Sequence, residues 1–495
     1  MSDVSRNGIS PLALPELTRN NRWLTGSTGG RSVATGRTLA LVMAGAAFAL
    51  PAAAQDVNPL LTFSFSSSLH VTDNYDLSND PEGTTTYIDN RLGLSYLTET
   101  ETQRLALDAS GVLRVANYPG SGDNSGTQTD FDDHTLRFDY TLTGANSRLN
   151  ANAYYNRSDI AFFDPFRLVN DGINLDPEDL TVTSVYREVM RGGLRFETGT
   201  EGPLSFSAGI TGQKRNYLET DDPSLEANES YTVTSGVGML ITPTTRLTLD
   251  GLYRDYSAED AEETDRQTRS LSVGVIQEMA SGLTINGSVG YQTIETEENY
   301  LDGRRTEDSN GVIGQLGLTQ QLTNGTAGLS FSQTRNTSGG RSTLQVSRDM
   351  ELPDGELAAS LGVSRGDQSG RTSMIGSLAY SHALQNGTFR LSLAQQVYSN
   401  SDDEEVETRS LNIGLSHELT PVSGIHLNVS YVDIDTLDSG DDRKRGRFQA
   451  SYNHELTQDW DLSGGYEYTR LERQSGTATE NAVFLTIQRQ FQFRP

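Results

Sequence analysis

The chain has 495 residues, 48 glycines, 20 tyrosines, no cysteine and a formal net charge of -28, and only 35% of its residues are hydrophobic. The absence of cysteine excludes disulfides, thiolate metal sites and cysteine nucleophiles, and the acidic balance argues against nucleic acid as a partner because phosphates require a basic face. After Leu50 no apolar run reaches about eighteen residues, which excludes a membrane protein built from helices. A transmembrane barrel remains compatible with this composition, since only alternate residues of its strands meet lipid.

The N-terminal stretch has the pattern of a secretory leader. A long polar stretch with scattered arginines ends at Arg37, an apolar run extends from Leu39 to Leu50, Pro51 interrupts it, and small residues lead to Ala54. We therefore expect a cleaved leader over residues 1–54 and a mature barrel domain over residues 55–495. Because the polar stretch is long for a leader, translation beginning nearer Val33 is the alternative.

Strands with two different faces follow the leader. The first extends from Leu61 to Val71, so soon after the expected cleavage site that we expect no plug domain. The last extends from Val483 to Phe493, and its apolar residues alternate with mostly polar ones. The same pattern, about ten residues long, recurs along the mature chain, and a tilted strand needs this length to cross a bilayer. The recurrence favours a transmembrane barrel over a soluble sandwich.

The connections between these strands are of two kinds in alternation. One kind is short and contains pairs that tolerate positive φ, such as Asn324-Gly325 and Asn386-Gly387. We expect ten such turns, at residues 98–101, 143–146, 198–203, 242–245, 280–282, 323–325, 353–355, 385–387, 420–424 and 457–459. The other kind is longer, polar and acidic, at residues 73–85, 119–132, 159–179, 219–229, 258–266, 296–307, 401–405 and 433–442.

This alternation predicts the fold. Short periplasmic turns and long external loops are typical of barrels in the outer membrane of Gram-negative bacteria. Ten hairpins with one further strand at each end predict an all-β, antiparallel, up-and-down transmembrane barrel of about 22 strands, within a range of about 18 to 24. The irregular stretch from Asp159 to Arg191 contributes most to that range.

One face of the predicted strands is apolar and should meet lipid. Its members include Leu105, Leu107, Leu113, Val115, Leu136, Phe138, Tyr140, Leu247, Leu249, Tyr253, Leu427, Val429 and Tyr431. Aromatic residues should form girdles at the membrane interfaces, and the candidates are Tyr96, Tyr140, Tyr253, Tyr291, Tyr380, Tyr431, Tyr452, Trp460, Phe491 and Phe493. Three histidines, His382, His417 and His454, recur on the same face before successive turns, where polar residues at headgroup level explain them better than metal binding or catalysis.

The opposite face is polar and should line a wet lumen. The lumen candidates carry both signs of charge: Arg91, Arg104, Asp108, Arg114, Arg137, Asp139, Arg148, Asp250 and Arg254. The arginines would line a path for anions or for an acidic polysaccharide. Pairing with neighbouring carboxylates across the strands explains them equally well.

No sequence pattern indicates a cofactor, a metal site or a catalytic centre. The acidic loops, such as residues 259–265 and 402–405, lack the ligand spacing of a calcium loop. Solvated surface explains them, with divalent cations at lipid headgroups or at the channel mouth as the alternative. The six histidines show no triad spacing, and phosphate-cradling or metalloprotease motifs are absent. We therefore expect neither an enzyme nor a bound cofactor or metal.

The stretch Val71 to Leu77, which contains Asp73-Asn74, and the following Leu92 to Tyr96 resemble the opening of a family of proteobacterial outer-membrane β-barrel porins. Some members of that family resemble barrels found with exopolysaccharide secretion genes. The resemblance extends loosely from Leu61 to Phe493 and implies an outer-membrane barrel without catalytic residues. Many such barrels end on the terminal aromatic residue itself, whereas Arg494-Pro495 follows Phe493 here.

We expect a passive pore or export channel of the outer membrane that carries small solutes or a polysaccharide. The alternative is a structural or surface-interaction barrel whose loops block the lumen. The expected partners are outer-membrane lipids, the barrel assembly machinery, which would recognise Phe493, and the transported solute. The substrate, the oligomeric state and gating stay open.

Overall fold

The computed structural model describes residues 59–494 apart from 121–124, 168–176, 181, 184, 219, 221, 223–224, 301–302, 338, 368, 400–403 and 438–441. The expected leader lies outside these described residues. Apart from two short 3-10 helices, η1 (Ile160–Phe162) and η2 (Pro177–Leu180), the regular structure is strand. Within the described part of the chain, no helix is long and apolar enough to cross a membrane.

The strands are β1 (Leu60–Thr72), β2 (Thr85–Glu99), β3 (Gln103–Tyr118), β4 (Gly126–Gly144), β5 (Ser147–Asp159), β6 (Tyr186–Thr198), β7 (Leu204–Leu218), β8 (Asn228–Thr242), β9 (Thr245–Ala258), β10 (Asp265–Glu278), β11 (Leu283–Tyr300), β12 (Gly303–Leu322), β13 (Gly325–Asn336), β14 (Gly339–Leu352), β15 (Gly355–Gly366), β16 (Thr372–Leu384), β17 (Gly387–Ser399), β18 (Glu405–Thr420), β19 (Ser423–Thr436), β20 (Arg443–Glu455), β21 (Trp460–Arg473) and β22 (Gly476–Phe493).

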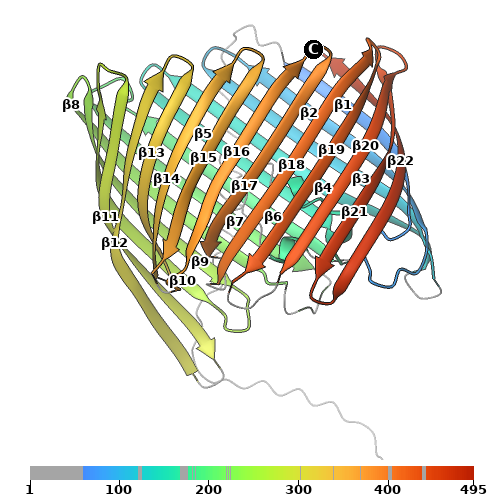
Figure 1. The fold of residues 1–495 in the computed structure, drawn as a ribbon, viewed down its shortest axis with the longest axis horizontal. Coiled ribbons are helices and arrows are strands. Elements are labelled where there is room, and N and C mark those ends of the chain that lie inside the picture. Colours follow the sequence, from blue (N-terminus) through green and yellow to red (C-terminus); the bar gives the residue numbers. More distant parts are fainter. Residues whose placement is uncertain are drawn as a thin grey trace, which may run out of the picture. The chain divides into compact units, whose positions relative to one another are not determined.

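These 22 strands form one closed sheet. Each strand pairs antiparallel with its neighbours in sequence, and β1 pairs with β22 from Leu61↔Phe493 to Thr72↔Ala482 (Figure 1). Closure leaves no open sheet edge in lipid, which a membrane-spanning sheet requires. The predicted up-and-down antiparallel barrel and its strand number are confirmed.

An apolar belt covers the outer face of the barrel. Val289 of β11 is 61% exposed, and it pairs with Val273 of β10 and Gly314 of β12. Because paired residues share one face of a sheet, the belt continues from strand to strand. Several residues predicted to face lipid belong to the exposed large hydrophobic side chains: Leu107, Leu113, Leu136, Leu247, Leu249, Tyr253, Leu427 and Tyr431.

The ten predicted turns all join consecutive strands at one edge of the barrel, which we call the turn edge. At Asn324-Gly325 the geometry requires glycine, since Gly325 has a φ of +126° and an added Cβ would lie 2.1 Å from the carbonyl oxygen of Asp349. Chain order places the start of β1 and the end of β22 at the same edge. By the outer-membrane rule this edge is periplasmic and the opposite, loop edge is external.

The predicted alternation of short turns and long loops is wrong at some outer connections. Residues 296–307 were expected as a loop, but β11 continues to Tyr300 and β12 begins at Gly303, so the two strands form a long hairpin that projects past the barrel rim (Figure 1). An ion pair between Arg304 and Glu297 links its strands, and alternating polar pairs suit a hairpin in water. The connection between Arg473 and Gly476 is also a tight turn, so short connections occur at both edges.

The face assignment makes a direct prediction for β11. Val289→Arg should lower the free energy of unfolding by about 2–4 kcal/mol, because a charge near the middle of the lipid face must leave water. Ser288→Arg is the matched control, because Ser288 lies on the opposite, lumen face. There the arginine side chain can extend into water. Urea unfolding of the refolded variants in lipid vesicles measures both. Equal losses for the two variants would contradict the assignment.

Candidate functional site: the barrel lumen

A β-bulge in β4 brings three carboxylates to the lumen. Asp133 and His134 together oppose Gly111 of β3, and Asp133 adopts a φ of 47°. Without this register shift, the alternation that directs Leu136 toward lipid would direct Asp132 toward lipid as well. Asp132 and Asp133 are adjacent, so on a regular strand their side chains would point to opposite faces, and both reach the lumen only at a bulge. The sequence therefore held a signal for this bulge in the spacing of its carboxylates.

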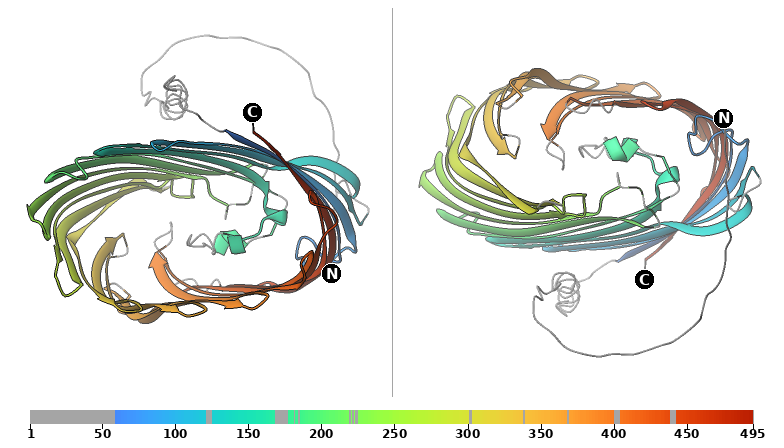
Figure 2. Two further views of the ribbon diagram at one scale, coloured as in Figure 1. Left: turned by 90° about the horizontal axis from the view of Figure 1, so that it is seen from above. Right: turned by 90° about the horizontal axis from the view of Figure 1, so that it is seen from below.

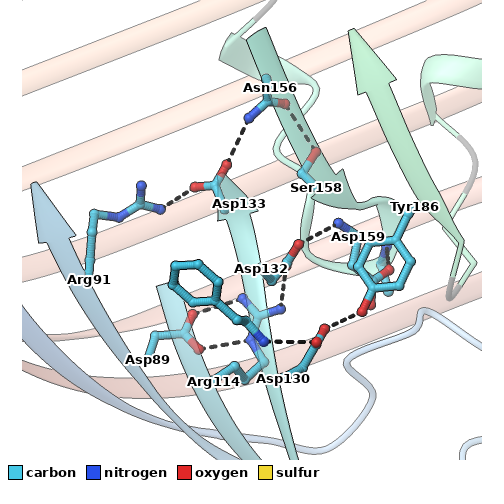
Figure 3. Close-up of polar contacts among 12 residues, drawn as sticks. Asp89, Arg91, Arg114, Asp130, Asp132, Asp133, Asn156, Ser158, Asp159 and Tyr186 are labelled. Carbon is cyan, nitrogen blue, oxygen red and sulfur yellow. Dashed lines mark hydrogen bonds and ion pairs between the residues drawn. The ribbon is translucent and has the colours of Figure 1, made fainter. Parts of the chain in front are cut away.

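The lumen-facing Arg114 of β3 is the centre of a polar network (Figure 3). Its guanidinium donates two hydrogen bonds to Asp89 at 2.8 and 2.9 Å and one to Asp132 at 3.0 Å. Its Cζ also lies 3.4 Å from the ring centroid of Phe162. The side chains of Arg114 and Asp132 are 8% and 1% exposed, so this is a buried ion network rather than a free cation facing the channel.

The network continues on both sides of Arg114. Arg91 forms an ion pair with Asp133, whose carboxylate also accepts a hydrogen bond from Asn156 at 3.1 Å. Tyr186 donates a hydrogen bond to Asp130, and Asp132 accepts one from the backbone N–H of Asp159 at 2.9 Å (Figure 3). Strands β2 to β6 are therefore cross-linked near the loop edge.

The predicted lumen residues divide into two groups. Arg91, Arg114, Arg137 and Asp139 form ion pairs, and the Arg137–Asp139 pair measures 2.9 Å on an exposed surface. For the others, the contacts among described residues include no ion pair: Arg104, Asp108, Arg148, Asp250 and Arg254. Their role in permeation stays a prediction.

The connection between β5 and β6 enters the barrel. We call its described residues between Ile160 and Val185 the inward segment, and the end-on views show η1 and η2 inside the ring of strands (Figure 2). The carboxylate of Asp159 begins it by accepting a hydrogen bond from the N–H of Ala161 at 2.9 Å, which caps η1.

Apolar packing attaches the inward segment to the far wall. Phe166 and Leu180 pack against Val406, Val432 and Ile434 of β18 and β19, and all five are at most 2% exposed. Burying each such side chain stabilises the fold by about 1.5–3 kcal/mol. Two further clusters join the segment to β21, β22 and neighbouring loops through Ala161, Val182, Leu471, Ala478 and Leu77, and through Ile160, Val185 and Leu225.

Two ion pairs accompany this packing. Asp179 accepts a hydrogen bond from Arg187 of β6 at 2.7 Å, with both side chains almost fully buried, and Asp164 pairs with Arg447 of β20 at 2.9 Å. The guanidinium groups also stack on rings of the segment, Arg187 on Phe163 at 3.9 Å and Arg447 on Phe166 at 4.8 Å. The side chains of Arg447 and Asp164 are 19% and 30% exposed, so this pair contributes about 1 kcal/mol at most. The buried Arg187–Asp179 pair must offset its own desolvation cost, so apolar burial dominates the attachment.

The Asp73-Asn74 pair has a structural role. Asp73 accepts hydrogen bonds from the backbone N–H and the side-chain amide of Asn481 at 2.7 and 2.8 Å. Asn74 donates to the carbonyl oxygens of Thr479 and Ser78 at 3.0 and 2.8 Å. Both residues thus extend the β1–β22 seam beyond its last ladder pair. The first outer loop is thereby fixed to the last strand.

Cavities remain beside this packing, and Tyr398 both contacts the Phe166–Leu180 cluster and lines the larger cavity. A cavity of 750 Å³ lies along β13 to β18, and its lining includes Ser392, Gln396 and Asn412. A second cavity of 340 Å³ lies nearer the loop edge, where its lining includes Gln345, Ser360 and Ser377. The inward segment therefore narrows the lumen but leaves these cavities beside it.

The predicted girdle residues lie near both edges. Tyr253, Tyr291, Tyr452 and Phe493 have exposed side chains. Near the turn edge, Arg489 lies 5.2 Å from the ring of Trp460 and 4.2 Å from that of Phe491, an arrangement in which a cationic side chain on the outer face can reach headgroups. The girdle role of these residues, and of Tyr96, Tyr140, Tyr380 and Tyr431, stays a prediction.

The repeated histidines accompany the girdle aromatics. His382 and His454 stack on Tyr380 and Tyr452 with centroid distances of 6.1 and 6.3 Å. Among the residues that the structure describes, no group of three or more His, Asp or Glu side chains could hold a metal ion.

No protein-family model and no curated protein matches this sequence. Solved structures match it over most of its length. The ferric-catecholate import receptor Fiu from E. coli K12 is 9% identical with a TM-score of 0.56, covering 88% of this chain and 82% of that chain. The FrpB iron transporter from Neisseria meningitidis is 11% identical with a TM-score of 0.56 and the same coverage, 88% and 82%. A mutant of the ferric enterobactin receptor PfeA from Pseudomonas aeruginosa is 10% identical with a TM-score of 0.51, covering 87% and 81%.

The chain is an outer-membrane β-barrel. At these low identities the likeness shows the fold, and the closed antiparallel sheet with its apolar belt is the architecture of that membrane. Membership of the porin family, or of the exopolysaccharide-associated barrels, is a more specific assignment than this fold and stays a proposal.

Proposed function

We propose that the protein is a passive channel for small polar solutes, narrowed by the inward segment. The observation that carries this proposal is the coexistence of a segment packed against β18 and β19 and a cavity of 750 Å³ that extends along β13 to β18. Barrels with fewer strands than these 22 already enclose an aqueous channel. The similar solved structures are named as a receptor and a transporter of iron compounds, which supports a transport role without naming the solute here.

The alternative is a structural or surface-interaction barrel with a blocked lumen. One observation favours it: three apolar clusters gather inside the loop-edge half, and they contain side chains from three outer connections, such as Leu77, Leu180 and Leu225. In that case the acidic exterior would meet lipid, capsule or a partner protein. Substrate choice between small solutes and an exported polysaccharide depends on how wide the passage is.

Single-channel recording in planar bilayers tests the proposal, with full-length protein purified from outer membranes. We expect steady conductance steps, because the polar wall beside the cavities can hold water and ions. Heat-dependent mobility on a gel is the control for correct folding. Correctly folded protein that conducts nothing would contradict the channel and favour the blocked barrel.

A further inference from the structure

Charge is distributed unevenly around the lumen. The networks of Arg114 and Arg187 lie on β2 to β6, and Arg447 faces the inward segment from β20. In contrast, the lumen positions at middle height on β14 to β18 carry uncharged side chains, which are polar residues interspersed with Ala358, Ile375, Ala379 and Ala394. We call six of the polar residues the hydroxyl wall: Gln345, Ser360, Ser377, Ser392, Gln396 and Ser410.

Strand alternation places the hydroxyl wall inside the barrel. Its residues alternate with the exposed apolar belt, as Gln345 does with Leu344 and Val346, and as Ser360 does with Leu361. Side-chain hydrogen bonds connect the wall across strands. Gln345 donates to Ser360 at 2.8 Å, and the hydroxyls of Ser360 and Ser377 lie 2.8 Å apart. Each hydroxyl can donate and accept, so these side chains can turn toward water or a solute.

Both cavities lie along this wall. The smaller one borders Gln345, Ser360 and Ser377, and the larger one borders Ser392 and Ser410, while Gln396 borders both. Their volumes of 340 and 750 Å³ fall in the range of sites for small molecules. Ala394 and Gln396 line both cavities, so the two cavities adjoin along β14 to β18, and we call the pair the track.

Charged groups along the track are confined to its two ends. At the outer end Arg341 is neutralised by Glu405 at 2.7 Å. At the inner end Asp349, Glu351, Glu356 and Arg390 border the larger cavity. Between them the wall offers hydrogen bonds but no fixed charge, so it can replace the hydration of a hydroxyl-rich solute but cannot balance the charge of an ion.

We infer that solutes pass along the hydroxyl wall, which takes uncharged, hydroxyl-rich molecules, whereas the charged sector serves to attach the inward segment. This inference rests on the proposed channel function. It departs from the alternative in which the lumen arginines line a path for anions or an acidic polysaccharide.

The absence of native cysteine allows a thiol test of the path. Ser377→Cys places a thiol on the hydroxyl wall, and Ser158→Cys places one near the end of β5, where Ser158 is 5% exposed. A trimethylammonium-bearing methanethiosulfonate reagent should remove about half of the single-channel conductance of Ser377→Cys and shift its reversal potential toward anion selectivity. The Ser158→Cys channel should be unchanged. A response of Ser158→Cys without one of Ser377→Cys would overturn the inference.

Liposome swelling tests the solute class with the unmodified protein. Uncharged sucrose should enter faster than the smaller anion gluconate, and faster entry of gluconate would overturn the inference. In both of these outcomes the protein forms a channel. Failure of the proposed function looks different, because the wild-type protein would then show no conductance in the bilayer.

Discussion

Excision of residues 163–181, with Phe162 and Val182 joined by a short Gly-Ser connection, should raise single-channel conductance roughly two- to five-fold. The reason is geometric, because Phe166 and Leu180 bring the segment across to the inner face of β18 and β19. Without it, the current would no longer be confined to the track along β14 to β18. Planar-bilayer recording of the variant beside the wild type measures the change.

The matched control removes residues 298–305 at the tip of the β11–β12 hairpin. This tip also lies at the loop edge, but it projects past the barrel rim (Figure 1). Its removal should leave conductance unchanged. If both excisions behave alike, or if removal of the inward segment changes nothing, the segment does not limit the passage.

Replacement of Arg114 by methionine should lower the free energy of unfolding by about 3–5 kcal/mol. Methionine retains apolar contact with Phe162 but leaves the carboxylate of Asp132, which is 1% exposed, without its cation. Loss of the charge partner dominates over loss of packing, because an uncompensated buried charge costs more than a few lost contacts. Urea unfolding of refolded protein, followed by Trp460 fluorescence, measures the effect.

A triple variant separates buried charge from packing. Adding Asp89→Asn and Asp132→Asn to Arg114→Met removes all three charges, and the amide that Asp132→Asn introduces keeps an oxygen that can accept the hydrogen bond from the N–H of Asp159. We expect stability to return to within about 1 kcal/mol of the wild type. A triple variant as unstable as Arg114→Met would mean that side-chain shape, rather than charge, gives the network its importance.

For most residues of the candidate site, the sequence pattern predicted only which face of the strand the side chain lies on, not which residues it contacts. The prediction placed Arg91 and Arg114 toward the lumen, but their partners Asp133 and Asp132 depend on the bulge in β4. The histidine repeat and the Asp73-Asn74 pair were visible in the sequence. Only the structure gave the latter a role, because its partner Asn481 lies at the opposite end of the chain.

The sequence by itself determined the barrel: strand length, alternation of faces, turn chemistry and the number of hairpins are local properties, and closure follows because unpaired edges are too costly in lipid. It did not determine what occupies the lumen. The position of the inward segment depends on contacts between distant residues, Phe166 with Val432 and Asp164 with Arg447, and no local pattern encodes such pairings. The division of the lumen into a charged sector and a hydroxyl wall also depends on the tertiary structure, because only the closed barrel determines which strands contact the segment and which border the cavities.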